Sequence, residues 1–562
     1  MPDENLFKKV PVKVQNRSGY DKSNHNIFTG CIGQLLPMFC EEVIPNHTIS
    51  TKVAISTQLP PLATDTFMRL SQKVEAFFVP TRLLMKDYER WITRNHKLEY
   101  SGGTSLIAPP CIQVPYNNLH AASLLDYLGC MVSKAGIDAC RESGANPSKV
   151  TLSAFPVLCY NLIWDEWYRN SLIQKSCFYN EAEYALEHLN DAAALKKYEL
   201  SKMKFITPTN SLGHTDPGVI TTGTAHFTGA DGYDMLAIRM RNFGLDYFTS
   251  ATPSPQNGPA SVINIDTSGA SGTLSIAAIR SANSIQQFEE RQNLAGNRLV
   301  DFVKAQYGAN LSDMIAQRPV LLGSASFDVY SKGIYQTANN SENAVALNNP
   351  FDASVGARFG SAYAEGNDFI IKDFTANEPG YIMIITSLVP RVTYSSGLKR
   401  YLRHYLSENS QGDMANPILQ NVGPQPIYQY ELNDTNMFQL NDSSIDDVFG
   451  YADRYSEFKS NQDELHGLIR DGYDLSSFAL QRTFHSQSVE ISDDFLQIPY
   501  FYLDQILAYT DSNTRLFDYW TDSYIQSFES MPLSRYSIPT LQDPAYEHGH
   551  TVVLDKGGVK LG

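Results

Sequence analysis

The clearest pattern of apolar and polar positions lies in residues 74–91, with the sequence VEAFFVPTRLLMKDYERW. Residues 74–79 form a short, mostly apolar run of strand-favouring types, and Pro80 then has no N–H to donate to a strand ladder. In residues 83–91 apolar side chains recur at helical spacing, with charged side chains between them. The pattern predicts a buried strand that ends at Val79, followed by a short amphipathic helix packed against it.

Further segments show strand or helix periodicity. Apolar and polar residues alternate most clearly in Thr48–Ile55 and again in Ala325–Tyr335, as expected of strands with one buried face. Tyr381–Val389 is apolar enough to be a buried strand. Helices are predicted at residues 117–133, 155–172 and 181–204, and two more, parted by Gly296, at residues 279–308. These helices interrupt the strands without a regular alternation, which argues against a doubly wound parallel sheet. Many short strands with long excursions favour an antiparallel sandwich or barrel, and the jelly roll best tolerates such excursions.

The length of 562 residues exceeds the size at which one hydrophobic core normally stops growing. The chain therefore holds either several domains or one core with large insertions. Residues 1–23 form an N-terminal arm, and residues 92–154 and 173–240 are insertions between core elements. Residues 337–368, rich in Asn, Ser, Ala and Gly, form a surface loop.

Composition narrows the class of protein. Hydrophobic residues make up 43% and charged residues 19%, which is typical of a soluble globular protein, and no apolar run reaches the roughly 20 residues of a membrane span. The N-terminus lacks the pattern of a signal peptide, so we expect folding in a cytosol and no membrane insertion. The seven cysteines are odd in number and form no CxxC, so we expect reduced core residues.

The sequence carries no motif of a known catalytic site. It has no GxSxG, no P-loop, no GxGxxG and no HExxH, so we expect no enzyme and no cofactor. His548 and His550 form an HxH near the C-terminus, and a solvated tail is favoured over a metal site there. The acidic pairs at residues 446–447 and 493–494 are read as surface residues, because adjacent side chains on a strand or turn point apart.

Charge bears on possible contact with nucleic acid. The net charge of -16 is opposite to that of a protein that neutralises a genome by itself. Basic residues do gather in the arm, where Lys8, Lys9, Lys13 and Arg17 are candidates for non-specific phosphate contacts with DNA. A solvated or intersubunit arm is an equally good interpretation.

Segments spread over most of the chain resemble, in the same order, the motifs of one family. RSGYDKS resembles the family's RSxFDxS, FFVPTRLL resembles FFVPNRL, YNLIWDEWYRNSL resembles YNxIWNEYFRDxNL, and LDYFTSATPSPQNGP resembles HDYFTSxLPxPQKGP. In the second half, RPVLLGS resembles RPEYLGG, EPGYIMI resembles EHGYIIG, VPRVTYSSGLKRYLR resembles RPxLTYxQGLxRxWxR, and FGYADRYSEFK resembles FGYQERWAEYR. The chain is similar to major capsid proteins of the Microviridae, the gokushovirus branch in particular.

The resemblance implies structural roles for the motif positions Phe78, Pro80, Arg82, Trp164, Arg169, Asp246, Tyr247, Phe248, Pro255, Gln256, Arg318, Pro319, Gly323, Tyr394 and Gly397. The chain departs from the family pattern at Val320 and Leu321, which replace Glu and Tyr, and at Pro379, which replaces His. The two insertions do not align with the family pattern. These departures are typical of a divergent member.

The resemblance also implies a fold and a function. The fold would be a mainly β, antiparallel viral jelly roll of about eight strands, formed as a single unit by residues 1–562. The function would be structural: about sixty copies assemble into a small icosahedral (T=1) shell around the circular single-stranded DNA of a bacteriophage. Expected partners are that DNA, a small basic DNA-packaging protein, other virion proteins and a host surface receptor, with assembly in the bacterial cytoplasm. A jelly-roll carbohydrate-binding module or glycoside hydrolase is the alternative.

Overall fold

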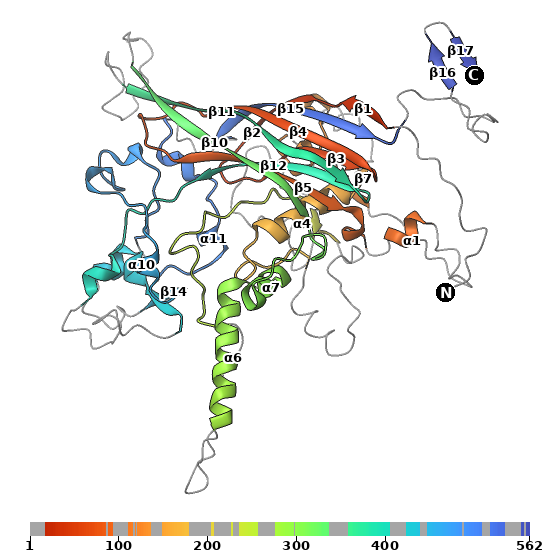
Figure 1. Ribbon diagram of the computed structural model, residues 1–562. Helices are drawn as coiled ribbons and strands as arrows, with labels where there is room; N and C mark the ends of the chain where they lie inside the picture. Colours follow the sequence, from red (N-terminus) through yellow and green to blue (C-terminus); the bar gives the residue numbers. More distant parts are fainter. Residues whose placement is uncertain are drawn as a thin grey trace.

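The computed structural model describes most of the chain and is built around one large antiparallel sheet (Figure 1). The described residues are 17–85, 88–93, 111–115, 119, 121–136, 149–178, 204–206, 226–228, 235–256, 276–296, 298–335, 358–404, 423–438, 447–485, 488–508, 517–533, 552–555 and 558–561. The sheet has nine strands in the order β1-β15-β4-β11-β10-β5-β12-β3, and β2 also pairs with β15. Its strands are β1 (Ser18–Asp21), β2 (Asn24–Gly30), β3 (Leu36–Val43), β4 (His47–Gln58), β5 (Leu70–Pro80), β10 (Val320–Tyr335), β11 (Arg358–Ala376), β12 (Gly380–Pro390) and β15 (Tyr519–Met531).

The long strand β10 lets the sheet curl over its own core. Its first part, from Val320 to Val329, pairs with β5, and its last part, from Tyr330 to Tyr335, pairs with β11. The two halves of the sheet therefore face each other as the two layers of a sandwich. Burial alternates strictly along β4 and nearly so along β15, because one face of these strands packs on the core and the other faces solvent.

β5 and β12 are buried on both faces. Val74 and Phe78 of β5 belong to the core inside the sandwich, whereas Phe77 and Val79 belong to a second apolar cluster on the opposite face. That second cluster is formed by α4 (Phe155–Ile163), the β6–β7 hairpin (Cys111–Pro115 and Lys149–Ser153) and α2 (Leu124–Tyr127). The near-continuous apolar run in residues 74–79 thus reflects a strand covered on each side.

Helices and short hairpins lie outside the sheet. α6 (Ile276–Ala295) points away from the body beside α7 (Leu299–Tyr307), as Figure 1 shows. The other α-helices and hairpins of the described residues are α1 (Tyr88–Ile92), α9 (Asp434–Phe438), α10 (Ser456–Lys459), α11 (Asp493–Leu496), β8–β9 (Lys204–Ile206, His226–Thr228), β13–β14 (Gln425–Tyr428, Val448–Ala452) and β16–β17 (Val552–Asp555, Gly558–Leu561). Short 3-10 and π helices connect several of these elements.

The fold class predicted from the sequence is confirmed: the protein is mainly β, antiparallel, and built as a jelly-roll type sandwich with large insertions. The main sheet has nine strands where about eight were expected. The predicted strands in residues 48–55, 325–335 and 381–389 are parts of β4, β10 and β12. The two helices parted by Gly296 are α6 and α7, and Gly296 has a φ of 114°.

Four expectations about local structure need correction or fall outside the described residues. Residues 358–368 of the expected surface loop belong to β11, and Ser18–Asp21 of the expected arm form β1. The helix expected at residues 117–133 contains only the single turn α2 there, apart from residues outside the described ranges. The helix expected at residues 181–204 lies almost wholly outside the described residues.

Two expectations from composition can be compared with the described residues. No described helix is long and apolar enough to cross a membrane. Cys31, Cys40, Cys130, Cys159 and Cys177 are free thiols.

Candidate functional site: clusters formed by the sequence motifs

Asp246 joins two motifs that are far apart in the chain. Its Oδ1 accepts hydrogen bonds from the backbone N–H groups of Phe248 (2.9 Å) and Thr249 (2.7 Å), which fixes the turn that contains it. Its Oδ2 accepts a hydrogen bond of 2.7 Å from the hydroxyl of Tyr394. The buried ring of Phe248 meets the Tyr394 ring edge to face, with centroids 5.0 Å apart. The motif at residues 245–259 is thus tied to the motif at residues 389–403.

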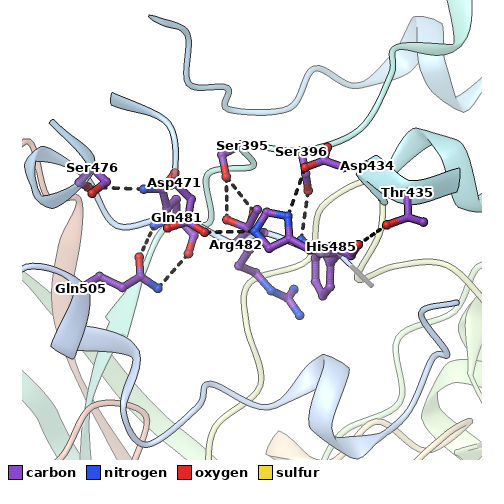
Figure 2. Close-up of polar contacts among 12 residues, drawn as sticks. Ser395, Ser396, Asp434, Thr435, Asp471, Ser476, Gln481, Arg482, His485 and Gln505 are labelled. Carbon is purple, nitrogen blue, oxygen red and sulfur yellow. Dashed lines mark hydrogen bonds and ion pairs between the residues drawn. The ribbon is translucent and has the colours of Figure 1, made fainter. Parts of the chain in front are cut away.

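The segment around Tyr394 lies between two other chain segments and is bonded to both. The N–H of Tyr394 donates to the carbonyl of Asp463, and that of Arg482 donates to the carbonyl of Thr393. Figure 2 shows the next contact, in which the N–H of Ser395 donates to the carbonyl of Arg482 at 3.2 Å. The segments around Asp463 and Arg482, which lie between β12 and β15 in the chain, are therefore held to this motif by backbone hydrogen bonds.

Gly397 occupies a position that only glycine fits. Its φ is +98°, in the left-handed region that side chains disfavour. A Cβ there would lie 2.1 Å from the carbonyl oxygen of Glu431. The carboxylate of Glu431 in turn accepts a hydrogen bond of 2.9 Å from the hydroxyl of Tyr247 and lies 3.7 Å from the Arg400 guanidinium. Burial raises the pKa of the Glu431 carboxyl, although the charge of Arg400 opposes that shift.

A second cluster surrounds the tryptophan motif that follows α4. The indole N–H of Trp167 donates to the carbonyl of Pro319 at 2.9 Å, and the Arg318 guanidinium lies over the Trp167 ring at 4.4 Å. Arg169 forms an ion pair with Asp165 at 2.9 Å. The tryptophan motif and the RPVLLGS motif therefore contact each other directly.

An ion pair joins β5 to this cluster. Arg241 approaches Glu75 at 2.7 Å, and the hydroxyl of Tyr168 donates to the same carboxylate at 2.5 Å. Burial by itself would raise the pKa of Glu75, but the hydrogen bonds and charge of Arg241, together with the Tyr168 hydroxyl, leave that pKa lowered. The carboxylate thus stays charged and ties β5 to the tryptophan motif and to the segment that begins at Arg241.

The remaining motif positions also have structural contacts. Phe78 packs inside the sandwich against Phe374, with ring centroids 5.1 Å apart, and Pro80 ends β5 opposite Gly380. Arg82 holds Glu378 of the EPGYIMI motif through two hydrogen bonds of 2.7 and 3.3 Å. Trp164 is buried, and the Arg239 guanidinium lies over its ring. A Cβ at Gly323 would lie 2.1 Å from the carbonyl oxygen of Ile370. Gln256, next to Pro255, accepts a hydrogen bond from Gln286.

Comparison with known proteins identifies the family. A family model described as "Capsid protein (F protein)" matches residues 8–541. The chain belongs to this capsid protein family. It is 25% identical to Capsid protein VP1 of Chlamydia phage 1, over 96% of this chain and 98% of that protein. It is 23% identical to Capsid protein VP1 of Bdellovibrio phage phiMH2K, over 84% of this chain and 86% of that protein. It is 22% identical to Capsid protein VP1 of Spiroplasma virus 4, over 91% of this chain and 93% of that protein.

The microvirus resemblance read from the motifs is confirmed by these matches, and the chain is a structural capsid protein of a phage. Its motif residues form internal contacts that join segments far apart in the chain to one another. Contacts such as Asp246 with Tyr394 join residues 148 positions apart, so their spacing in the sequence carries no signal of them.

The capsid protein has a further network that the sequence motifs did not indicate, drawn in Figure 2. His485 lies between two carboxylates, with Nδ1 3.2 Å from Asp434 and Nε2 3.1 Å from Asp471. The hydrogen bond with Asp471, followed by that with Asp434, raises the pKa of His485 despite partial burial. Beside it, Gln481 and Gln505 exchange two hydrogen bonds of 3.0 Å through backbone and side-chain amides.

The candidate basic residues of the arm divide into two sets. Lys8, Lys9 and Lys13 lie outside the described residues. Arg17 is exposed and donates hydrogen bonds to Asn46 (2.7 Å), Thr48 (2.6 Å) and Ser530 (2.9 Å to the carbonyl). It therefore holds β1 to β4 and β15 at one end of the sheet.

The described part of this capsid protein holds no group of three or more His, Cys, Asp or Glu side chains suited to a metal ion. His548 and His550 lie outside the described residues, as does Asp446. Asp493 and Asp494 begin α11, where acidic side chains favour a helix N-terminus. Burial, and then the charge of Asp494, raise the pKa of Asp493.

Proposed function

We propose that this protein is the major capsid protein of a microvirus, and that about sixty copies assemble into a T=1 icosahedral shell around circular single-stranded DNA. The observation that carries the proposal is the family match over residues 8–541, combined with a sandwich whose motif residues are engaged in internal contacts. The motif residues thus serve to hold the subunit together, and we assign no catalytic activity to them.

Self-association is supported by the surface of the subunit. Large apolar side chains are exposed at several places, among them Phe67 (76%), Met131 (85%) and Leu245 (83%). Permanent interfaces bury roughly 2,000 to 5,000 Å² and are rich in apolar and aromatic side chains. A closed shell needs heterologous contacts around its fivefold and threefold axes and isologous contacts across its twofold axes.

The net charge of the subunit supports a second, positively charged component inside the shell. A subunit with a net charge of -16 does not neutralise packaged phosphates, so the shell needs a small basic DNA-packaging protein or bound cations. Lys8, Lys9, Lys13 and Arg17 would add local phosphate contacts. Other virion proteins and a host surface receptor would bind the exterior, where the insertion at residues 173–240 is the candidate contact. The subunits would assemble in the bacterial cytoplasm and act in the virion.

Electron microscopy of the purified full-length chain, alone and with a short basic peptide and single-stranded DNA, tests the proposal. We expect closed shells of uniform diameter, and nuclease-resistant DNA only when the basic peptide or multivalent cations are present. A chain that stays monomeric under all these conditions and binds oligosaccharides would refute the proposal in favour of a carbohydrate-active jelly roll. Shells that retain DNA without any added cation, with steep salt dependence, would refute the need for a basic partner.

A further inference from the structure

The solvent-facing side of the sheet formed by β2, β15, β4 and β11 carries aromatic side chains in two rows. One row lies on β15 and the other on β11, on either side of β4. The rows consist of Trp520, Tyr524 and Phe528 on β15 and Tyr363 and Phe369 on β11, with exposed fractions between 37% and 60%. We call this surface the aromatic track.

The strand between the two rows bears only short or flexible side chains on its outer face. Its outward positions are Thr48, Ser50, Lys52, Ala54, Ser56 and Gln58, most of them half-buried between the neighbouring strands. The register places Trp520 and Tyr363 on either side of Gln58, and Phe528 beside Ser50. With strands about 4.8 Å apart, the two aromatic rows stand about 10 Å apart, and the longer row, from Trp520 to Phe528, covers about 27 Å along β15. A path of this width fits one extended strand.

The charges on the track favour bases over phosphates. Asp522 and Glu365 lie on the same face and are exposed, and Nε2 of His25 on β2 lies 2.7 Å from Asp522. The two carboxylates disfavour phosphate groups on this face. Lys52, whose ammonium lies 5.4 Å from the centroid of the Phe369 ring, supplies a single positive charge near the middle. Arg17 supplies a second positive charge at the end of β4 through its bond to Thr48. Base stacking on aromatic rings needs no such charges, because every base has a π-face.

We infer that the aromatic track is a stacking platform for unpaired bases of single-stranded DNA, with the phosphates turned away from the sheet. This inference rests on the proposed function and adds to it the surface and the mode of contact. It places the free face of this sheet toward the inside of the shell. A second copy of the chain is the less suitable occupant, because interface centres are depleted in charged residues and this face holds Lys52, Asp522 and Glu365 near its middle.

Fluorescence titration with a short oligodeoxythymidylate tests the platform directly. Trp520 is one of four tryptophans, of which Trp164 is buried, so stacking should quench part of the emission in a saturable way. Trp520→Phe should remove that quenching while filter binding shows nearly unchanged affinity, because phenylalanine still stacks. The double variant Trp520→Ala/Phe528→Ala should lose affinity by roughly tenfold or more for each ring removed.

The matched control is Tyr473→Ala/Phe501→Ala, which removes two rings of similar exposure that lie off the track. It should bind the oligonucleotide as the wild type does, and both double variants should keep the wild-type circular dichroism spectrum because all four side chains are exposed. Phe369→Ala on β11 provides an independent variant on the other row. Affinity should fall with salt no more steeply than for one or two phosphate contacts, a slope of about -0.7 each.

Several results would overturn the inference. The first three are an unchanged affinity for the oligonucleotide in Trp520→Ala/Phe528→Ala, an equal loss of affinity in the control variant, and a steep dependence of affinity on salt. The fourth is a track variant that loses shell assembly while still binding DNA. In the last case the face is an interface between copies. If shells filled with DNA form and the track variant binds normally, the inference fails and the proposed function stands. If no shells form under any condition, the proposed function fails whatever the titration gives.

Discussion

At the scale of single residues, the family motifs mark positions where backbone geometry leaves few choices. Gly397 combines a left-handed φ with close contact to the Glu431 carbonyl, and Gly323 leaves room for the Ile370 carbonyl. Asp246 satisfies two backbone N–H groups and one buried hydroxyl with a single carboxylate. A replacement at such a position leaves either a steric clash or an unpaired buried group.

Gly397→Ala should lower the free energy of unfolding of the unassembled subunit by about 3 kcal/mol or more, since the left-handed conformation and the clash with Glu431 add. Gly472→Ala is the matched control, because Gly472 has a φ of 80° but nothing within 4 Å of its Cβ position. It should cost only about 1 kcal/mol. Urea unfolding followed by tryptophan fluorescence measures both, and equal losses would show that the clash contributes nothing.

At the scale of elements, the sequence predicted those strands whose apolar pattern is undiluted. β4 alternates and β12 is continuously apolar, and both were expected close to where they lie. The beginning of β11 was missed because its buried positions are Gly360, Ala362 and Ala364, whose small side chains conceal the alternation. Contacts between motifs were beyond prediction, because a hydrogen bond such as that of Tyr394 with Asp246 depends on how distant segments meet in space.

The loop around His485 should lose stability as pH rises. The folded-state pKa of His485 is raised above its ordinary value of 6.5 by Asp471 and Asp434. The protonated ring therefore contributes its full stabilisation below pH 6.5, and this is lost as pH rises through the raised pKa. The thermal midpoint of the wild type should exceed that of His485→Gln at low pH, and the difference should shrink toward high pH.

Asp471→Asn is the companion variant for this pH series, since it removes the carboxylate that contributes most to the raised pKa of His485. Its midpoint should show a smaller dependence on pH than that of the wild type. Differential scanning fluorimetry over the pH range from 5 to about 9 is sufficient, because only relative midpoints are compared. If the difference in thermal midpoint between the wild type and His485→Gln does not change with pH, protonated His485 does not stabilise the loop through Asp471 and Asp434.

At the scale of the whole molecule, α6 has little support from its own subunit, because Asn293 is its one buried residue. Its C-terminal end is anchored by Asn293, whose amide donates to Thr252 at 3.1 Å and to the Ser254 carbonyl at 2.6 Å. Its N-terminal half extends away from the sheet with Ile276, Ile279 and Ile285 exposed. An isolated helical segment of about ten residues, the length of this half, is only marginally stable in water, so contact with a neighbouring copy is what would keep it helical.

Replacing Ile279 and Ile285 together by Asp should therefore block shell formation while changing the unfolding midpoint of the free subunit very little, because both side chains are already exposed in it. Ser281→Asp/Gln287→Glu adds the same charge to exposed positions of the same helix without removing an apolar group, and it should still assemble. Size-exclusion chromatography and electron microscopy distinguish the two. If the isoleucine variant forms normal shells, α6 faces solvent in the virion, and the contacts that close the shell must come from the other exposed apolar surfaces of the subunit.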